Sequence, residues 1–338
     1  MLRIVKQSLF LSAMTWTLLA PSVQAQDFYK GKTLSLIVGY AAGGGYDVNA
    51  RLLSRHLGKY VAGKPSVVVV NMPGAGSLKM LEYLDQTAPG DGTAMGLFDF
   101  TQITNSLLTP EVVKIDFRRF KWIGSLAEDL AVCYVSNRTG AQTLADAQKL
   151  SSLPMGRTNP GSSSDIQQKI FRKTFNVRVK SVAGYAGSSE AFLALERGEL
   201  DGGCMTWSSL PAHWISEDKI TPLLKLSSGS APDLPSTIPD AQSLLTDERD
   251  RLILSVLTEA SKLGKPFVAS LRTPDARVKE LRQAFMDTVK DPSFLEEAQK
   301  LRQSISAVEG PAAQAILDRL YATPPDAVEA AKRIASDD

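Results

Sequence analysis

The chain has 338 residues, 43% of them hydrophobic and 22% charged, and a formal net charge of +2. This composition is typical of a globular protein, and the near-neutral charge argues against a nucleic-acid partner. With only Cys133 and Cys204, the sequence offers neither a disulfide framework nor a cysteine metal cluster.

The first 25 residues have the pattern of a secretory signal peptide. Arg3 and Lys6 precede a mostly apolar run over residues 9–20, and Val23-Gln24-Ala25 is a small-residue site for cleavage after Ala25. The apolar run is too short to span a bilayer comfortably, and no lipobox cysteine lies near the cleavage site. We therefore expect an exported, soluble protein in the periplasm of a Gram-negative cell. Removing 25 residues from 338 leaves 313, enough for two α/β lobes.

A strand, a glycine turn and a helix come next. Residues 34–38 are mostly apolar, Tyr40 and Gly43-Gly44-Gly45 follow, and apolar residues recur at helical spacing from residue 48. Glycines let the backbone approach a ligand, and the first N–H groups of a helix are free to bind it. The turn therefore predicts an anion seat, and the alternative is a plain crossover turn.

Asp47 stands where this helix begins. We expect its carboxylate to cap the helix by accepting from the N–H groups of Asn49 or Ala50. Neither common phosphate motif fits, because the glycines are contiguous rather than G-x-G-x-x-G and because Gly31-Lys32-Thr33 precedes the strand. Nucleotide binding is therefore disfavoured.

A second unit of the same kind follows the first. The valines at 67–70 predict a second buried strand, and Gly74-Ala75-Gly76-Ser77 forms a turn before a helical pattern over residues 78–84. The carboxyl ends of neighbouring parallel strands lie on one edge of a sheet, so this turn should lie beside the first. Two such turns on one edge favour a ligand site more strongly than one turn does.

Several motifs resemble the substrate-binding proteins of tripartite tricarboxylate transporters, the Bug or TctC-like family. Gly43-Gly44-Gly45-Tyr46-Asp47, Asn71-Met72-Pro73-Gly74-Ala75-Gly76 and Pro89-Gly90-Asp91-Gly92-Thr93 are similar to the family's G-G-G-x-D, N-x-P-G-A-G and P-D-G-Y-T. Tyr185-Ala186-Gly187 and Asp233-Leu234-Pro235-Ser236 resemble its Y-K-G and D-V-P-T. The resemblance covers most of the mature chain.

This resemblance implies an α/β fold of the two-lobed periplasmic binding protein class, type II-like. Each lobe would be a mostly parallel sheet flanked by helices, with the ligand cleft between the lobes. Residues 26–127 and 229–338 would form lobe 1, and residues 128–228 would form lobe 2. The family binds organic acids through such loops, without a cofactor or metal, and delivers them to the membrane permease subunits of the transporter.

A turn in the second lobe mirrors the opening stretch. Arg157 and Thr158 end a strand, and Ser162, Ser163 and Ser164 begin a helix, so N–H and hydroxyl donors gather at its start. The family has G-x-G-S-x-x-H-L here, and Asp165 stands where its histidine would be, which leaves the ligand contacts of this loop open. Arg157 is a candidate partner for a second carboxylate of the ligand, and the alternative is a solvated strand-end arginine.

Further candidates lie on the next turns. Tyr185 and Trp207 are candidates to line the pocket, and the alternative is that they are core aromatics. Tyr40 is a further candidate, and Gly187 lies in the turn after the strand at 177–182. Residues 253–257 and 266–270 are expected in the core of the first lobe. For the cysteines, the apolar runs around them favour two separately buried thiols over a pair.

Nothing in the sequence favours an enzyme. His56 is expected at the surface and His213 in a loop, no G-x-S-x-G is present, and no His or Cys pair has metal-ligand spacing. The alternative function is a ligand-binding sensor that signals to a two-component histidine kinase. The identity of the acid stays open, and a monomer is expected.

Overall fold

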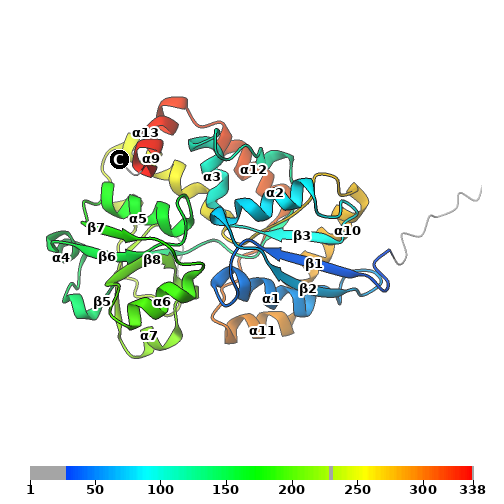
Figure 1. The fold of residues 1–338 in the computed structure, drawn as a ribbon, viewed down its shortest axis with the longest axis horizontal. Helices are drawn as coiled ribbons and strands as arrows, with labels where there is room; N and C mark the ends of the chain where they lie inside the picture. Colours follow the sequence, from blue (N-terminus) through cyan, green and yellow to red (C-terminus); the bar gives the residue numbers. More distant parts are fainter. Residues whose placement is uncertain (1–27, 228–230, 337–338) are drawn as a thin grey trace, which may run out of the picture.

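The computed structural model describes residues 28–227 and 231–336, and within these ranges the strands form two sheets that lie side by side (Figure 1). The expected signal peptide over residues 1–25 and its cleavage after Ala25 lie outside the described residues. None of the helices in these ranges is long and apolar enough to cross a membrane.

The first sheet has six strands in the order β11-β4-β10-β3-β1-β2. They are β1 (Thr33–Val38), β2 (Ser66–Asn71), β3 (Ala94–Leu97), β4 (Lys121–Ser125), β10 (Pro266–Ala269) and β11 (Val308–Glu309). Successive side chains of β1 point to opposite faces, so Leu36 and Val38 join one hydrophobic cluster and Ile37 joins the other. One face is covered by α1 (Gly45–Leu57), α10 (Asp275–Thr288) and α11 (Pro292–Lys300), the other by α2 (Leu78–Gln86), α3 (Thr101–Leu108) and α12 (Gly310–Tyr321).

The second sheet has five strands in the order β7-β6-β8-β5-β9. They are β5 (Ala131–Ser136), β6 (Leu153–Gly156), β7 (Val179–Val182), β8 (Gly202–Thr206) and β9 (Ile220–Lys225). The helices of this part are α4 (Leu144–Lys149), α5 (Ser163–Lys173), α6 (Ser188–Glu196) and α7 (Ala212–Ser216). Short 3-10 helices span Ala75–Ser77, Phe117–Arg119, Asn137–Thr139, Trp207–Ser209 and Glu259–Leu263.

The two-lobed α/β fold is confirmed, but both sheets are mixed rather than mostly parallel. β1 runs parallel to β2 and β3, whereas β10 is antiparallel to β3 and β4. In the second sheet, β6 is parallel to β7, whereas β5 is antiparallel to β8 and β9. β4 and β5 flank the first crossing between the sheets and β10 follows the return, so the antiparallel pairs arise where the chain changes lobes.

The prediction that residues 67–70 form a buried strand was wrong in one respect. They do form β2, but β2 is an edge strand paired only with β1 among the described strands. Val67 and Val69 pack against the hydrophobic cluster that contains Leu36, whereas Val68 and Val70 are 47% and 42% exposed. A run of valines predicts a strand without stating whether a neighbour covers its second face.

Two helices join the parts of the molecule in a way that the sequence did not predict. Ile253 and Leu257 of α9 (Glu248–Thr258), expected in the core of the first lobe, instead belong to the cluster that holds Phe171 of α5. The last helix, α13 (Pro325–Ala335), packs on α9, α5 and α3, and in Figure 1 it lies next to α9. The short α8 (Ala241–Leu244) contributes Ala241 to the same cluster. The lobe boundaries at 127–128 and 228–229 stay a prediction.

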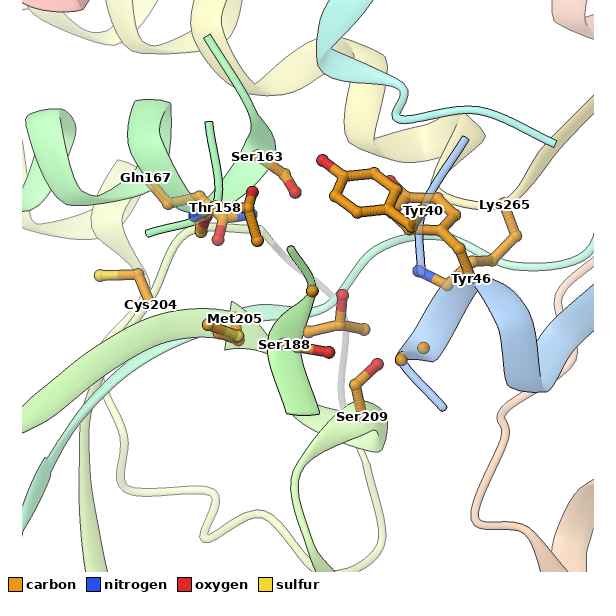
Figure 2. Close-up of a pocket in the computed structure, with 15 residues that line it drawn as sticks. Tyr40, Tyr46, Thr158, Ser163, Gln167, Ser188, Cys204, Met205, Ser209 and Lys265 are labelled. Carbon is orange, nitrogen blue, oxygen red and sulfur yellow. The ribbon is translucent and has the colours of Figure 1, made fainter. Parts of the chain in front are cut away.

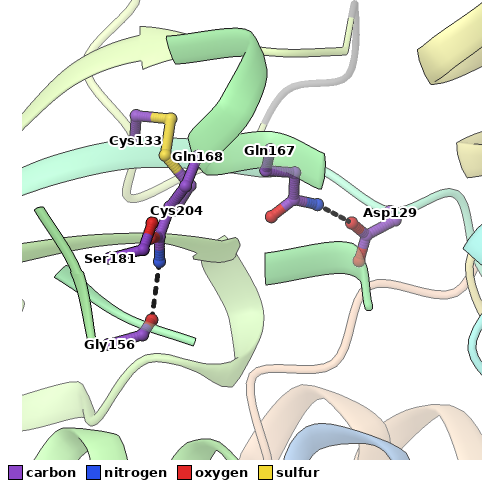
Figure 3. Close-up of a disulfide and its surroundings, with 7 residues drawn as sticks. All are labelled: Asp129, Cys133, Gly156, Gln167, Gln168, Ser181 and Cys204. Atoms are coloured by element: carbon purple, nitrogen blue, oxygen red, sulfur yellow. Dashed lines mark hydrogen bonds between the residues drawn. A yellow bond between two sulfur atoms is a disulfide. The ribbon is translucent and has the colours of Figure 1, made fainter. Parts of the chain in front are cut away.

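The expectation of two separate thiols was wrong, because Cys133 and Cys204 form a disulfide (Figure 3). Cys133 lies on β5 and Cys204 on β8, and the two are direct partners in the antiparallel register with Cα atoms 4.0 Å apart. Sequence spacing cannot reveal a pairing that depends on strand register.

His56, expected at the surface, is buried at 6% exposure. Helix α11 covers it, with the ring of Phe294 packed edge-on against the imidazole. His213 lies on α7, where its ring nitrogen is 2.8 Å from Glu196.

Candidate functional site

The turns that follow β1 and β2 lie side by side, as predicted from parallel pairing. The Asn71 side chain donates to the carbonyl oxygen of Tyr40 and to Asp47, both at 2.9 Å, and so ties the two turns together. A Cβ on Gly39 would lie 2.2 Å from Ser77 Oγ, so the close approach of the turns requires glycine at 39.

Asp47 does not cap α1 in the predicted way. It is the third residue of the helix, and its carboxylate reaches back to accept from the Gly43 N–H at 2.9 Å instead of from residues 49 or 50. Burial opposes its ionisation, but hydrogen bonds from Arg51, Gly43 and Asn71 hold the pKa of Asp47 below its ordinary value. The Asp47 carboxylate therefore stabilises the turn by accepting hydrogen bonds from Gly43, Arg51 and Asn71.

A pocket lies between the lobes, with about 530 Å³ of non-atom space, part of it open to solvent (Figure 2). Seven of the predicted residues line it: Tyr40, Gly44, Gly45, Thr158, Ser163, Ser164 and Gly187.

The other predicted site residues do not line this pocket: Gly43, Asp47, Gly74, Ala75, Gly76, Ser77, Arg157, Ser162, Tyr185 and Trp207. The second glycine turn does not line the pocket, and its Gly76 carbonyl accepts a hydrogen bond from the Gln102 side chain at 2.8 Å. Arg157 donates to Asp165 at 2.5 Å, so the chain itself supplies its carboxylate. The Trp207 indole N–H donates to Asp233 at 2.8 Å from a core position.

The sequence reasoning missed eight lining residues: Tyr46, Gln167, Ser188, Cys204, Met205, Thr206, Ser209 and Lys265. Ser188 stands next to a predicted turn and was within reach of that argument. No sequence pattern pointed to Lys265, because a single lysine before a strand is common. Its position in the pocket depends on the return of the chain to the first sheet.

Two helix starts lie side by side in the wall of the pocket. α1 begins after Gly44 and α6 begins after Gly187, and no described side chain caps either helix. They nearly touch, because a Cβ on Gly44 would lie 3.1 Å from Ser188 Oγ. Helix N-termini carry partial positive charge and free N–H donors, so two neighbouring helix starts favour an anion beside them.

Lys265 adds a buried cation at this wall. It is 3% exposed, its Nζ is 3.2 Å from Asp129 Oδ1, and it lies 4.9 Å from the centre of the Tyr46 ring. Asp129 also accepts from Thr206 Oγ1 and from Gln167 Nε2. Lys265 precedes β10 of the first sheet, whereas Thr206 ends β8 and Gln167 lies on α5, both in the second lobe. The contacts around Asp129 therefore join the two lobes.

The start of α5 is already occupied by the chain. Asp99 Oδ2 accepts from the Ser163 N–H at 2.9 Å and from the Tyr40 hydroxyl at 2.7 Å. Nearby, the Asn105 side chain donates to the Gly161 carbonyl at 2.6 Å, a second bond between the lobes. The predicted donor turn at 162–164 therefore exists, but one of its N–H groups binds a carboxylate of the first lobe.

Two tyrosines form a further part of the wall. The rings of Tyr40 and Tyr46 are stacked, with centroids 5.1 Å apart. Burial, followed by the negative charge of Asp99, raises the pKa of Tyr40 and Tyr46 well above the ordinary value. Both phenols are therefore neutral, and Tyr40 donates its hydroxyl proton to Asp99.

Comparisons with known proteins give the same fold. No family model matches the chain. One curated relative, the UPF0065 protein in the TAR-I ttuE-ttuC' intergenic region of Agrobacterium vitis, is 26% identical over 196 residues, and the match spans 56% of either chain. The chain thus covers about half the length of this relative.

Two solved structures extend the comparison over nearly the whole chain. The periplasmic binding protein BugD is 19% identical with a TM-score of 0.71, covering 89% of this chain and 97% of its own. MatC from Rhodopseudomonas palustris, solved with bound malate, is 17% identical with a TM-score of 0.69, covering 90% of this chain and 99% of its own. The predicted resemblance to Bug and TctC proteins is confirmed at the level of the fold.

Proposed function

We propose that this chain is a periplasmic solute-binding protein that captures a small organic acid between its lobes. The observation that carries this proposal is the pairing of the α1 and α6 starts in the wall of a pocket that also holds Lys265. Backbone N–H groups are fixed donors that lose no side-chain entropy on binding, and charge-assisted hydrogen bonds are worth about 1.5–3 kcal/mol each.

The two lobes explain how capture becomes a signal to a partner. An acid that touches both α1 and α6 binds the closed arrangement better than an open one and shifts the population toward it. The fold shared with MatC, a malate-bound protein, supports a carboxylate as the ligand. We propose that the closed form delivers the acid to the permease subunits of a tripartite tricarboxylate-type transporter.

A thermal-shift panel tests the proposal. The chain from Gln26 is unfolded and refolded without reductant to remove carried-over ligand, then heated with carboxylic acids, amino acids or sugars. An acid at about a hundred times its dissociation constant should add about 2.7 kcal/mol, a shift of several degrees. A rise with amino acids or sugars alone would overturn the carboxylate proposal.

A pair of variants localises the site. Gly44→Val places bulk between the helix starts and should abolish the shift, whereas Ala42→Val introduces a valine at an exposed turn position and should keep it. If Gly44→Val folds and still responds fully, the acid binds elsewhere.

Export and delivery need separate measurements. The mature chain recovered by osmotic shock should begin at Gln26, and a strain without the chain should lose uptake of the acid while its permease is intact. Unchanged uptake with a lost transcriptional response to the acid would favour a sensor of a two-component kinase instead.

A further inference from the structure

We infer that the captured acid is a monocarboxylate that carries a hydroxyl group, an inference that rests on the proposed carboxylate-binding function. Three features of the described residues support it: the carboxylate of Asp99 at the start of α5, the charge balance of the pocket, and a buried amide oxygen of Gln167 that lacks a donor.

Asp99 fills the place where a second ligand carboxylate would bind. It is fully buried, and Thr101 fixes its other oxygen, Oδ1, through the backbone N–H at 3.0 Å and the hydroxyl at 2.7 Å. Oδ2 then receives the Ser163 N–H across the cleft. A second carboxylate of the ligand would compete for the same N–H and would face a buried like charge.

The pocket balances one negative charge. Lys265 is paired with Asp129, and Arg157 and Lys169 both contact Asp165, which leaves one positive charge. The buried carboxylate of Asp99 offsets this charge, so the formal charges of these side chains sum to about zero. The starts of α1 and α6 each carry about half a positive charge, and together they match a single carboxylate. A dianion would leave about one charge uncompensated in a buried site.

The side-chain oxygen of Gln167 is free to accept a hydrogen bond from the ligand. It lines the pocket at 6% exposure, and no described residue donates to its Oε1. Its Nε2 donates to Asp129 at 3.3 Å, which fixes the amide orientation, because a flipped amide would point its oxygen at a carboxylate (Figure 3). A buried acceptor without a donor is costly, and a ligand hydroxyl would satisfy it.

Part of the lining suits an apolar portion of the ligand. Met205, the Cys204 disulfide and the faces of the stacked Tyr40 and Tyr46 rings offer carbon and sulfur surface (Figure 2). The proposed ligand therefore has one carboxylate beside the two helix starts, one hydroxyl on Gln167 and an apolar portion against these side chains.

The test uses matched acids on the mature wild-type chain with calorimetry. Pairs with and without the hydroxyl, such as 3-hydroxybutyrate and butyrate or 4-hydroxybenzoate and benzoate, are compared with succinate and adipate. The best hydroxy acid should bind about tenfold more tightly than its deoxy partner, as expected for one hydrogen bond, and more tightly than either dicarboxylate. Equal binding within each pair, or tighter binding of dicarboxylates, would overturn the inference while leaving the carboxylate site intact.

Two variants assign the effects to residues. Gln167→Met keeps similar length and should bring the ratio of hydroxy-acid to deoxy-acid affinity close to one. Asp99→Asn removes the buried charge and should reduce the preference for monocarboxylates over dicarboxylates by about tenfold. Unchanged ratios in folded variants would contradict the assignment. If no carboxylic acid binds the wild type at all, the proposed function itself fails.

Discussion

The imidazole of His56 on α1 lies 2.6 Å from the carboxylate of Glu297 on α11, measured from Nε2 to Oε2. Arg55 contacts the same carboxylate at 2.7 Å. This contact fastens α11 to the helix whose start forms half of the proposed anion seat.

The contact predicts a pH dependence of stability. Hydrogen bonding from His56, partly opposed by burial, and a further bond from Arg55 lower the pKa of Glu297 below its ordinary value of 4.5. A carboxylate with a lowered folded pKa contributes its stability above 4.5 and loses it as the pH falls through the folded value. Glu297→Gln should cost about 0.5–1 kcal/mol at pH 7 because the group is partly exposed, with the difference shrinking at pH 3. Urea unfolding at both pH values measures this, with Glu296→Gln, on an exposed pair with Lys300, as a near-neutral control.

The Cys133–Cys204 bond should contribute substantially to stability. It closes a loop with a sequence separation of 71, for which the chain-entropy account gives about 4 kcal/mol. Reductant should therefore lower the urea midpoint of the wild type strongly. The Cys133→Ala/Cys204→Ala double variant should start from the lower midpoint and show no response to reductant. An oxidised wild type, verified by thiol quantification, with the midpoint of the double variant would contradict this prediction.

Gly39→Ala should destabilise the protein by about 1–3 kcal/mol through overpacking, because the new Cβ would lie 2.8 Å from the Ser77 backbone. Gly187→Ala is the matched control, since its Cβ would meet nothing closer than Ala41 at 3.7 Å. Adding Ser77→Gly to Gly39→Ala should recover part of the lost stability, because residue 77 has φ +83° and glycine adopts that conformation freely. Thermal unfolding of the four proteins decides the order.

Lys265→Met should cost about 3–5 kcal/mol, because it leaves Asp129 buried at 1% exposure without its cation. Combining it with Asp129→Asn should restore most of the stability. Lys262→Met, which removes an exposed cation three residues away, should change little. A stable Lys265→Met protein, measured by chemical denaturation, would show that the pair is not buried as described.

The local units of the fold were predictable and their assembly was not. Each strand–turn–helix unit follows from apolar periodicity and glycine, and the adjacency of the turns after β1 and β2 follows from parallel pairing. The exposure of Val68, the pairing of Cys133 and the burial of His56 depend on which elements lie alongside, which a single sequence does not state.

The candidate site divides in the same way. Gly44, Ser163 and Gly187 could be found because helix starts after glycine or serine turns have a local signature. Lys265 and Gln167 could not, because their position results from the crossings between the lobes. Nor could the sequence reveal that Asp99 would occupy the start of α5, since the two lie 64 residues apart.

The packing of α13 constrains how the molecule is built. Ala327 and Ala331 belong to the same buried cluster as Cys133 and Phe171, so the second lobe draws its interior from segments nearly two hundred residues apart. During synthesis from the N-terminus, this lobe cannot complete its interior until Ala331 has emerged. The second lobe would thus remain incompletely folded while residues 1–330 are made, and a premature stop before α13 would leave the apolar faces of α5 and α9 open to proteases.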